Sequence, residues 1–201
     1  MLACGHGPKR LWRERLRRGG ERVNTALRLS AAIDRMSIAI GKASAFLVLL
    51  AVLISAGNAF SRYLFSVSSN AWLEIQWYLF AGMFLLGAPY TLQQNEHVRV
   101  DLLYGSLSDR KQEWIDLLGG ICFLMPISLL IAWMAWPFFW HSFEQGEMSP
   151  NAGGLIRWPA KLLLPLGFTL LALQGVSEII KNIAALRGHS ELHKHYEKAV
   201  Q

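Results

Sequence analysis

The sequence predicts an all-α integral membrane protein with four transmembrane helices and both termini in the cytoplasm. Only 17% of the 201 residues are charged and 53% are hydrophobic, whereas about a quarter of the residues of a soluble domain are charged. The hydrophobic residues gather into four blocks, each long enough to cross a hydrocarbon core about 30 Å thick. These features leave no room for a separate soluble domain.

Residues 1–42 form a basic tail with ten Lys and Arg residues and three acids. A polybasic segment beside a membrane favours contact with anionic lipid. The net charge of +6 is therefore no indication of nucleic-acid binding. The two cysteines, Cys4 and Cys122, lie in this tail and in an apolar run, so no disulfide framework is expected.

The first two spans are predicted at 43–64 and 72–92, and the connector between them carries no charge. Pro89 near the end of the second span is expected to kink or loosen it. Polar side chains stand close to the connector on both spans: Asn58, Arg62, Glu74 and Gln76.

The other two spans are predicted at 115–140 and 158–180. Asp109, with Gln112 three residues later, is a helix-start signal for the third span. The polar segment before it is compatible with a short interfacial helix or an extended piece. The membrane domain is expected to cover 43–183 and a second tail 184–201.

The basic residues give the orientation. They gather in the two tails and in the connector between the second and third spans. Of the other two connectors, the first has none and the last has only Arg157. The positive-inside rule therefore places both tails and the middle connector in the cytoplasm.

Glu74 is the most informative polar residue, because a carboxylate inside an apolar helix needs a partner or a function. We expect it to form an ion pair with Arg62, with Asn58 and Gln76 as further hydrogen-bond partners. A transport carboxylate is expected near the bilayer midplane. Glu74 lies near the end of its span, which favours a structural clamp or a contact with a partner helix.

No catalytic or metal-binding arrangement emerges from the sequence. It contains neither a nucleophile with a matching base nor a glycine motif that cradles phosphate. Three histidines follow the last span, at positions 189, 193 and 195, but a tail is a poor metal cage. We therefore expect no enzymatic activity, no metal and no cofactor.

Several motifs resemble one known family. They are Arg62-Tyr63, NAWLEIQW (70–77), FLLGA (84–88), HVRVD (97–101), Trp158-Pro159 and LPLGF (164–168). Together they resemble the small membrane subunit, the Q or DctQ-like component, of tripartite ATP-independent periplasmic (TRAP) transporters. The resemblance covers roughly 43–183.

The resemblance implies a division of labour. A periplasmic solute-binding protein captures the solute, and a large permease subunit holds the sodium and substrate sites. This chain would brace the large subunit during sodium-driven uptake of an organic acid or similar solute across the bacterial inner membrane. The residues then expected in subunit contacts or a structural polar cluster are Asn58, Arg62, Glu74, Gln76, Trp77, His97, Arg99 and Asp101.

A second function remains open from the residues alone. The chain could act as a stand-alone small multidrug-type exporter, as a homodimer, with Glu74 as the coupling carboxylate. Transport by this chain without another subunit would distinguish the exporter from the accessory subunit.

Overall fold

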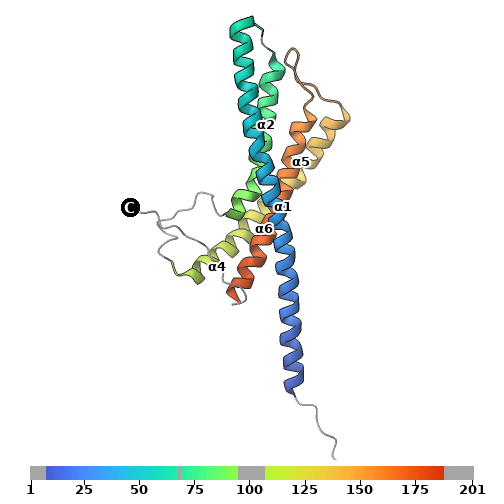
Figure 1. Ribbon diagram of the computed structural model, residues 1–201. Helices are drawn as coiled ribbons and strands as arrows, with labels where there is room; N and C mark the ends of the chain where they lie inside the picture. The colour runs from blue at the N-terminus through green and yellow to red at the C-terminus, as the bar shows by residue number, and fades with distance from the viewer. Residues whose placement is uncertain (1–7, 68, 95–106, 188–201) are drawn as a thin grey trace, which may run out of the picture.

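The computed structural model describes residues 8–67, 69–94 and 107–187, with side chains from Thr25 onward except that of Asp109. All the regular elements of this part are helical (Figure 1). They are α1 (Pro8–Phe65), α2 (Asn70–Gln94), α4 (Asp109–Gly119), the π-helical turn η1 (Gly120–Leu124), α5 (Met125–Glu144) and α6 (Trp158–Leu186).

Four helical stretches are long and apolar enough to cross a membrane, which confirms the prediction of an all-α protein with four membrane-spanning helices. The third stretch combines α4, η1 and α5. The observed helices α2 and α6 start within two residues of the predicted spans and run slightly further. The proposed interfacial helix falls at 95–106, outside the described residues, and the tail from 188 does as well.

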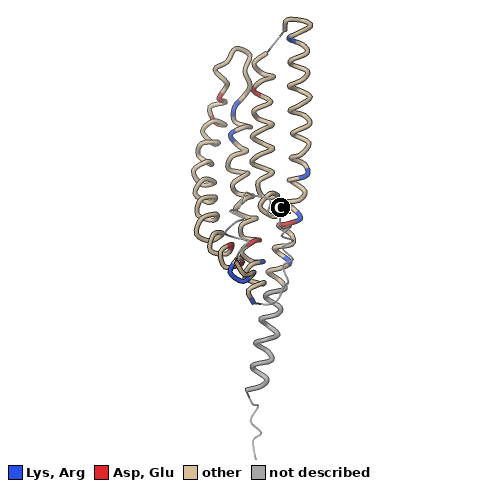
Figure 2. Tube along the Cα trace, turned by 90° about the vertical axis from the view of Figure 1, so that its left-hand side faces the viewer, with Lys and Arg blue, Asp and Glu red and all other residues tan. Residues whose placement is uncertain are grey.

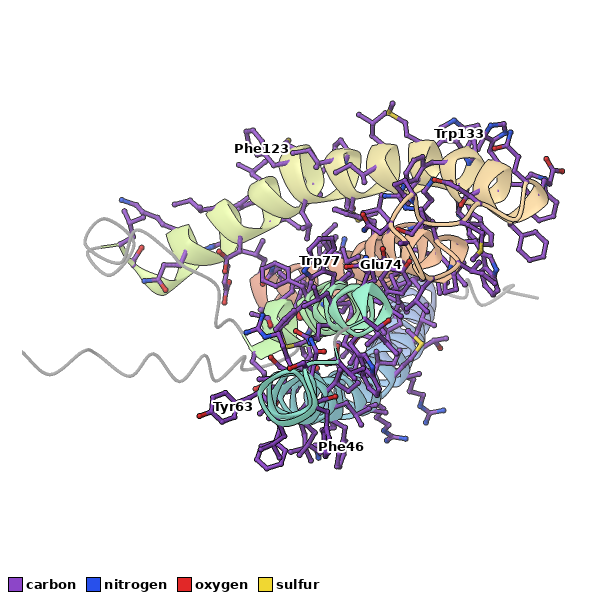
Figure 3. The ribbon with its side chains drawn as sticks, turned by 90° about the horizontal axis from the view of Figure 1, so that it is seen from above. Phe46, Tyr63, Glu74, Trp77, Phe123 and Trp133 are labelled. Atoms are coloured by element: carbon purple, nitrogen blue, oxygen red, sulfur yellow. The ribbon has the colours of Figure 1, made fainter. Side chains whose placement is uncertain are left out.

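Helix α6 is the centre of the bundle. Viewed from above, it lies between α5 on one side and the hairpin of α1 and α2 on the other (Figure 3). Helix α5 packs mainly on α6, so most of its circumference faces outward.

Helix α1 begins much earlier than the predicted first span. It runs unbroken over 58 residues, which corresponds to about 87 Å at 1.5 Å per residue, and extends past the other helices (Figure 1). Residues 25–42 were expected to belong to a tail on the lipid surface. Instead, Ser30, Ser37 and Gly41 lie on a buried face of α1 against α6 and α2. Small side chains at these positions allow the helices to approach closely.

The contact between α2 and α6 depends on a proline and a glycine. Pro89 has no N–H, so the carbonyl of Leu85 loses its usual helical donor. Gly167 of α6 lies against this carbonyl: a Cβ added there would be 2.7 Å from Leu85 Cβ and 2.9 Å from Leu85 O. A residue without a side chain is therefore required at this crossing.

The third membrane stretch changes its winding at η1. Pro126 cannot donate to the carbonyl of Cys122, and directly before it the chain forms a π-helical turn in which Met125 N–H bonds Gly120 O. Gly175 of α6 packs there, since a Cβ on it would lie 3.1 Å from a Leu124 methyl carbon. The turn thus joins α4 and α5 without losing contact with α6.

Candidate functional site

Glu74 lies in the second turn of α2 and is only 4% exposed. Its carboxylate accepts hydrogen bonds from the loop between α5 and α6. The donors are the Ser149 hydroxyl, Asn151 Nδ2 at 2.8 Å and the backbone N–H of Leu155 at 2.7 Å. The negative charge is therefore surrounded by donors, and this offsets the cost of burying it.

Two further side chains tie the same loop to α2. Asn70 Nδ2 donates to Ala152 O at 3.0 Å, and the Tyr78 hydroxyl donates to Ile156 O at 3.1 Å. Positions 70, 74 and 78 are four residues apart, so they share one face of the helix. We call Asn70, Glu74 and Tyr78, with residues 149–156, the outer clamp.

The loop has its own turn structure, which places its donors around Glu74. Gly153 has a φ of +71°, a conformation that residues with a side chain rarely adopt. Ser149 N–H donates to Leu155 O at 3.0 Å, and Arg157 N–H donates to Glu147 O at 2.9 Å. These bonds close the loop, so Ser149 and Leu155 approach the same carboxylate.

The predicted ion pair between Glu74 and Arg62 is wrong for the described residues. The loop occupies the carboxylate, while Arg62 is exposed on α1. The expected support from Asn58 and Gln76 is also missing, because Asn58 Oδ1 and Gln76 Nε2 are buried without a hydrogen-bond partner. Arg62 was predicted as the partner because it is the nearest opposite charge along the chain. The observed partners of Glu74 are 75 to 81 residues away.

Of the remaining predicted site residues, only Trp77 is described, and it makes no hydrogen bond to the outer clamp. Trp77 is an exposed residue of α2. His97, Arg99 and Asp101 lie outside the described residues.

An ion-pair cluster stands beside the outer clamp. Glu147 bonds Lys161 Nζ and lies 3.2 Å from Arg157 Nη1. The hydrogen bond from Lys161 keeps the pKa of the Glu147 carboxyl below its usual range, and the charge of Arg157 acts in the same direction. Lys161 also lies 4.1 Å from the centre of the Phe138 ring. The cluster connects the loop to the start of α6 and, through Phe138, to α5.

A second polar cluster joins α1 to the far end of α6, and none of its residues is among the predicted site residues. We call it the inner clasp; its members are Ser30, Asp34, Ser37, Gln174, Ser177, Glu178 and Lys181. Asp34 had been assigned to the tail. The heptad spacing of Ser30, Ser37 and Ser44 was the available signal for a buried face on α1.

Gln174 is the centre of the inner clasp and is fully buried. Its Oε1 accepts from the Ser37 hydroxyl at 2.7 Å. Its Nε2 donates to Asp34 Oδ1 at 2.8 Å and to Glu178 Oε1 at 3.0 Å. Lys181 Nζ lies 3.3 Å from Asp34 Oδ2 and 2.5 Å from Glu178 Oε1, so the ammonium group links the two carboxylates.

The two clusters lie toward opposite ends of α6. Figure 2 shows the charged residues of α6 toward its two ends, with a long uncharged stretch between them. Each cluster contains hydrogen bonds between separate elements of the chain, from the loop to α2 in the outer clamp and from α1 to α6 in the inner clasp. The two clusters therefore hold the helices together.

Comparison with known proteins identifies one family. A family model described as "Tripartite ATP-independent periplasmic transporters, DctQ component" matches residues 51–185. No curated protein and no solved structure gave a match. The matched range includes both sides of the outer clamp and the α6 half of the inner clasp.

Proposed function

Because this chain belongs to the DctQ component family of the tripartite ATP-independent periplasmic transporters, we propose that it braces the large permease subunit of such a transporter. The family is a transporter component rather than an enzyme. The chain is a multi-pass membrane protein with four apolar helices. As the small membrane subunit, it would hold the large subunit in position while that subunit moves the solute.

The observation that best supports a bracing role is the hydrogen bonding of the Glu74 carboxylate. Glu74 is a charged residue buried in a membrane-spanning helix, and such residues commonly mark transport pathways. Its carboxylate accepts three hydrogen bonds from the loop that precedes α6. A carboxylate held in this way stabilises the position of one helix relative to another.

The finer parts of the proposal follow from the family. Uptake would be driven by sodium and would depend on a periplasmic solute-binding protein, with an organic acid or similar molecule as the solute. The sodium sites would lie on the large subunit, and this chain would need no cofactor. Its location would be the bacterial inner membrane, with both termini in the cytoplasm.

The stand-alone exporter agrees less well with the structure. A coupling carboxylate must exchange protons or cargo with water on both sides of the membrane in turn. Glu74 is covered by the loop of residues 149–155, and releasing it would require at least three hydrogen bonds to break. The geometry therefore favours the bracing role.

Reconstitution in vesicles tests the proposal. The cognate large subunit is reconstituted with its binding protein and a sodium gradient, with and without this chain, and solute uptake is measured. We expect uptake only when this chain is present, and none from this chain alone. Solute or proton flux carried by this chain by itself, abolished in Glu74→Gln, would establish the exporter instead.

A further inference from the structure

Trp133 occupies an unusual position on α5. It is 78% exposed, more than any other tryptophan whose side chain the structure describes. Its indole points away from the bundle, on the side of the molecule opposite Phe46 (Figure 3). Nothing in the described part of this chain covers it.

The depth of Trp133 follows from the helix rise. Trp140, whose Nε1 donates to Glu144 at 2.7 Å, marks the polar end of α5. Trp133 lies seven residues further in, about 10 Å at 1.5 Å per residue. The nearest charge in the other direction is Asp116, seventeen residues or about 25 Å away. Trp133 therefore lies within the hydrocarbon layer rather than at its boundary, where tryptophans usually gather.

The indole N–H at this depth has no acceptor. Within the described residues, Trp140 donates its Nε1 to a carboxylate, whereas Trp133 has no hydrogen bond. Lipid chains cannot accept one, and an unpaired donor in an apolar medium is unfavourable. Exposure to lipid alone therefore leaves this group unsatisfied.

The backbone carbonyl of Trp133 also lacks its usual helical donor. Pro137 stands four residues later and has no N–H, so it cannot donate to the carbonyl of Trp133 as a helical residue would. Pro89 and Pro126 each remove a backbone donor in the same way. Gly167 lies against the carbonyl that Pro89 frees, and a π-helical turn forms directly before Pro126.

We propose that the outward face of α5 centred on Trp133 docks a transmembrane helix of the large permease subunit, and that this helix presents a hydroxyl or carboxamide side chain. Such a group can accept from the indole N–H and donate to the Trp133 carbonyl at the same time. Leu129, Leu130 and Trp136 complete the face, each at least 44% exposed. The inference rests on the proposed function, since it names where the braced subunit makes contact.

Crosslinking in the assembled complex tests the location. A photo-crosslinking amino acid replaces Trp133 in one variant and Phe46 in the other, because Phe46 is 69% exposed on α1 and carries no donor. Each variant is co-expressed with the cognate large subunit. We expect a crosslink to the large subunit from position 133 and none from position 46.

Co-purification tests the hydrogen bond. Trp133→Phe keeps the aromatic bulk and removes the N–H, and Phe46→Leu serves as the matched control. An interhelical hydrogen bond in a membrane corresponds to about a threefold to tenfold change in an equilibrium. We expect Trp133→Phe to reduce retention of the large subunit by this factor and Phe46→Leu to leave it unchanged.

The outcomes separate this inference from the proposed function. If the complex forms but crosslinks only from position 46, the large subunit docks elsewhere and the inference fails while the proposed function stands. Crosslinks from position 133 only to lipid, or to a second copy of this chain, also overturn it. Equal retention of both variants contradicts the hydrogen bond. If the unsubstituted chain retains no large subunit at all, the proposed function itself fails.

Discussion

Replacing Gly167 with alanine tests the close contact between α2 and α6. The new Cβ would lie 2.7 Å from Leu85 Cβ and 2.9 Å from Leu85 O. To restore an ordinary contact of about 3.4 Å, the two helices must move apart by about 0.7 Å. Much of the obstruction is backbone, which cannot rotate away as a flexible side chain can. Overpacking of this kind costs about 1–3 kcal/mol.

This cost is measured as the difference in the free energy of unfolding between the unsubstituted protein and Gly167→Ala in detergent micelles. Gly57→Ala is the matched control, because Gly57 is also inside a helix and has nothing within 4 Å of an added Cβ. There, alanine only removes the entropy cost of glycine and is expected to stabilise by up to about 1 kcal/mol. The two substitutions should therefore change the free energy of unfolding in opposite directions. If Gly167→Ala is as stable as the unsubstituted protein, the contact is looser than the structure indicates and the reasoning is wrong.

Three further predictions concern the polar clusters. Glu74→Leu should release the loop of residues 149–156 and make it accessible to protease. Glu74→Gln should retain part of the protection, because the carboxamide still has one acceptor oxygen. Equal digestion of the two variants would contradict the outer clamp. Gln174→Leu should destabilise by about 1–3 kcal/mol because it leaves buried partners unpaired, and a double-mutant cycle with Ser37→Ala should show coupling; strictly additive effects would exclude their hydrogen bond. The bond from Lys161 lowers the pKa of the Glu147 carboxyl in the folded protein. The contribution of Glu147 to stability should therefore be present at neutral pH and lost as the pH falls through that lowered pKa. The difference in thermal stability between the unsubstituted protein and Glu147→Gln should therefore vanish in acid, and a difference that is constant with pH would refute this.

Much of the fold could be read from the sequence. Four apolar blocks of membrane-spanning length predict four helices, since a helix satisfies its own backbone groups in lipid. The helix-start signal at Asp109 also places the start of α4 to within one residue, although the residue that caps the helix is Ser108. The start of α1 could not be placed, because residues 25–42 carry enough charge to resemble a tail. Only the partners on α6 show that one face of this segment is buried.

The sequence by itself determined that Glu74 needs partners, because the cost of a buried carboxylate depends on its surroundings in any fold. It could not determine which partners, and proximity along the chain pointed to Arg62. The tertiary structure brings residues 149–155 to the same carboxylate. The sequence likewise shows that Pro137 frees a carbonyl, but only the packing of α5 on α6 leaves Trp133 facing outward. Which polar groups meet depends on how the helices cross, and no local pattern along one helix records this.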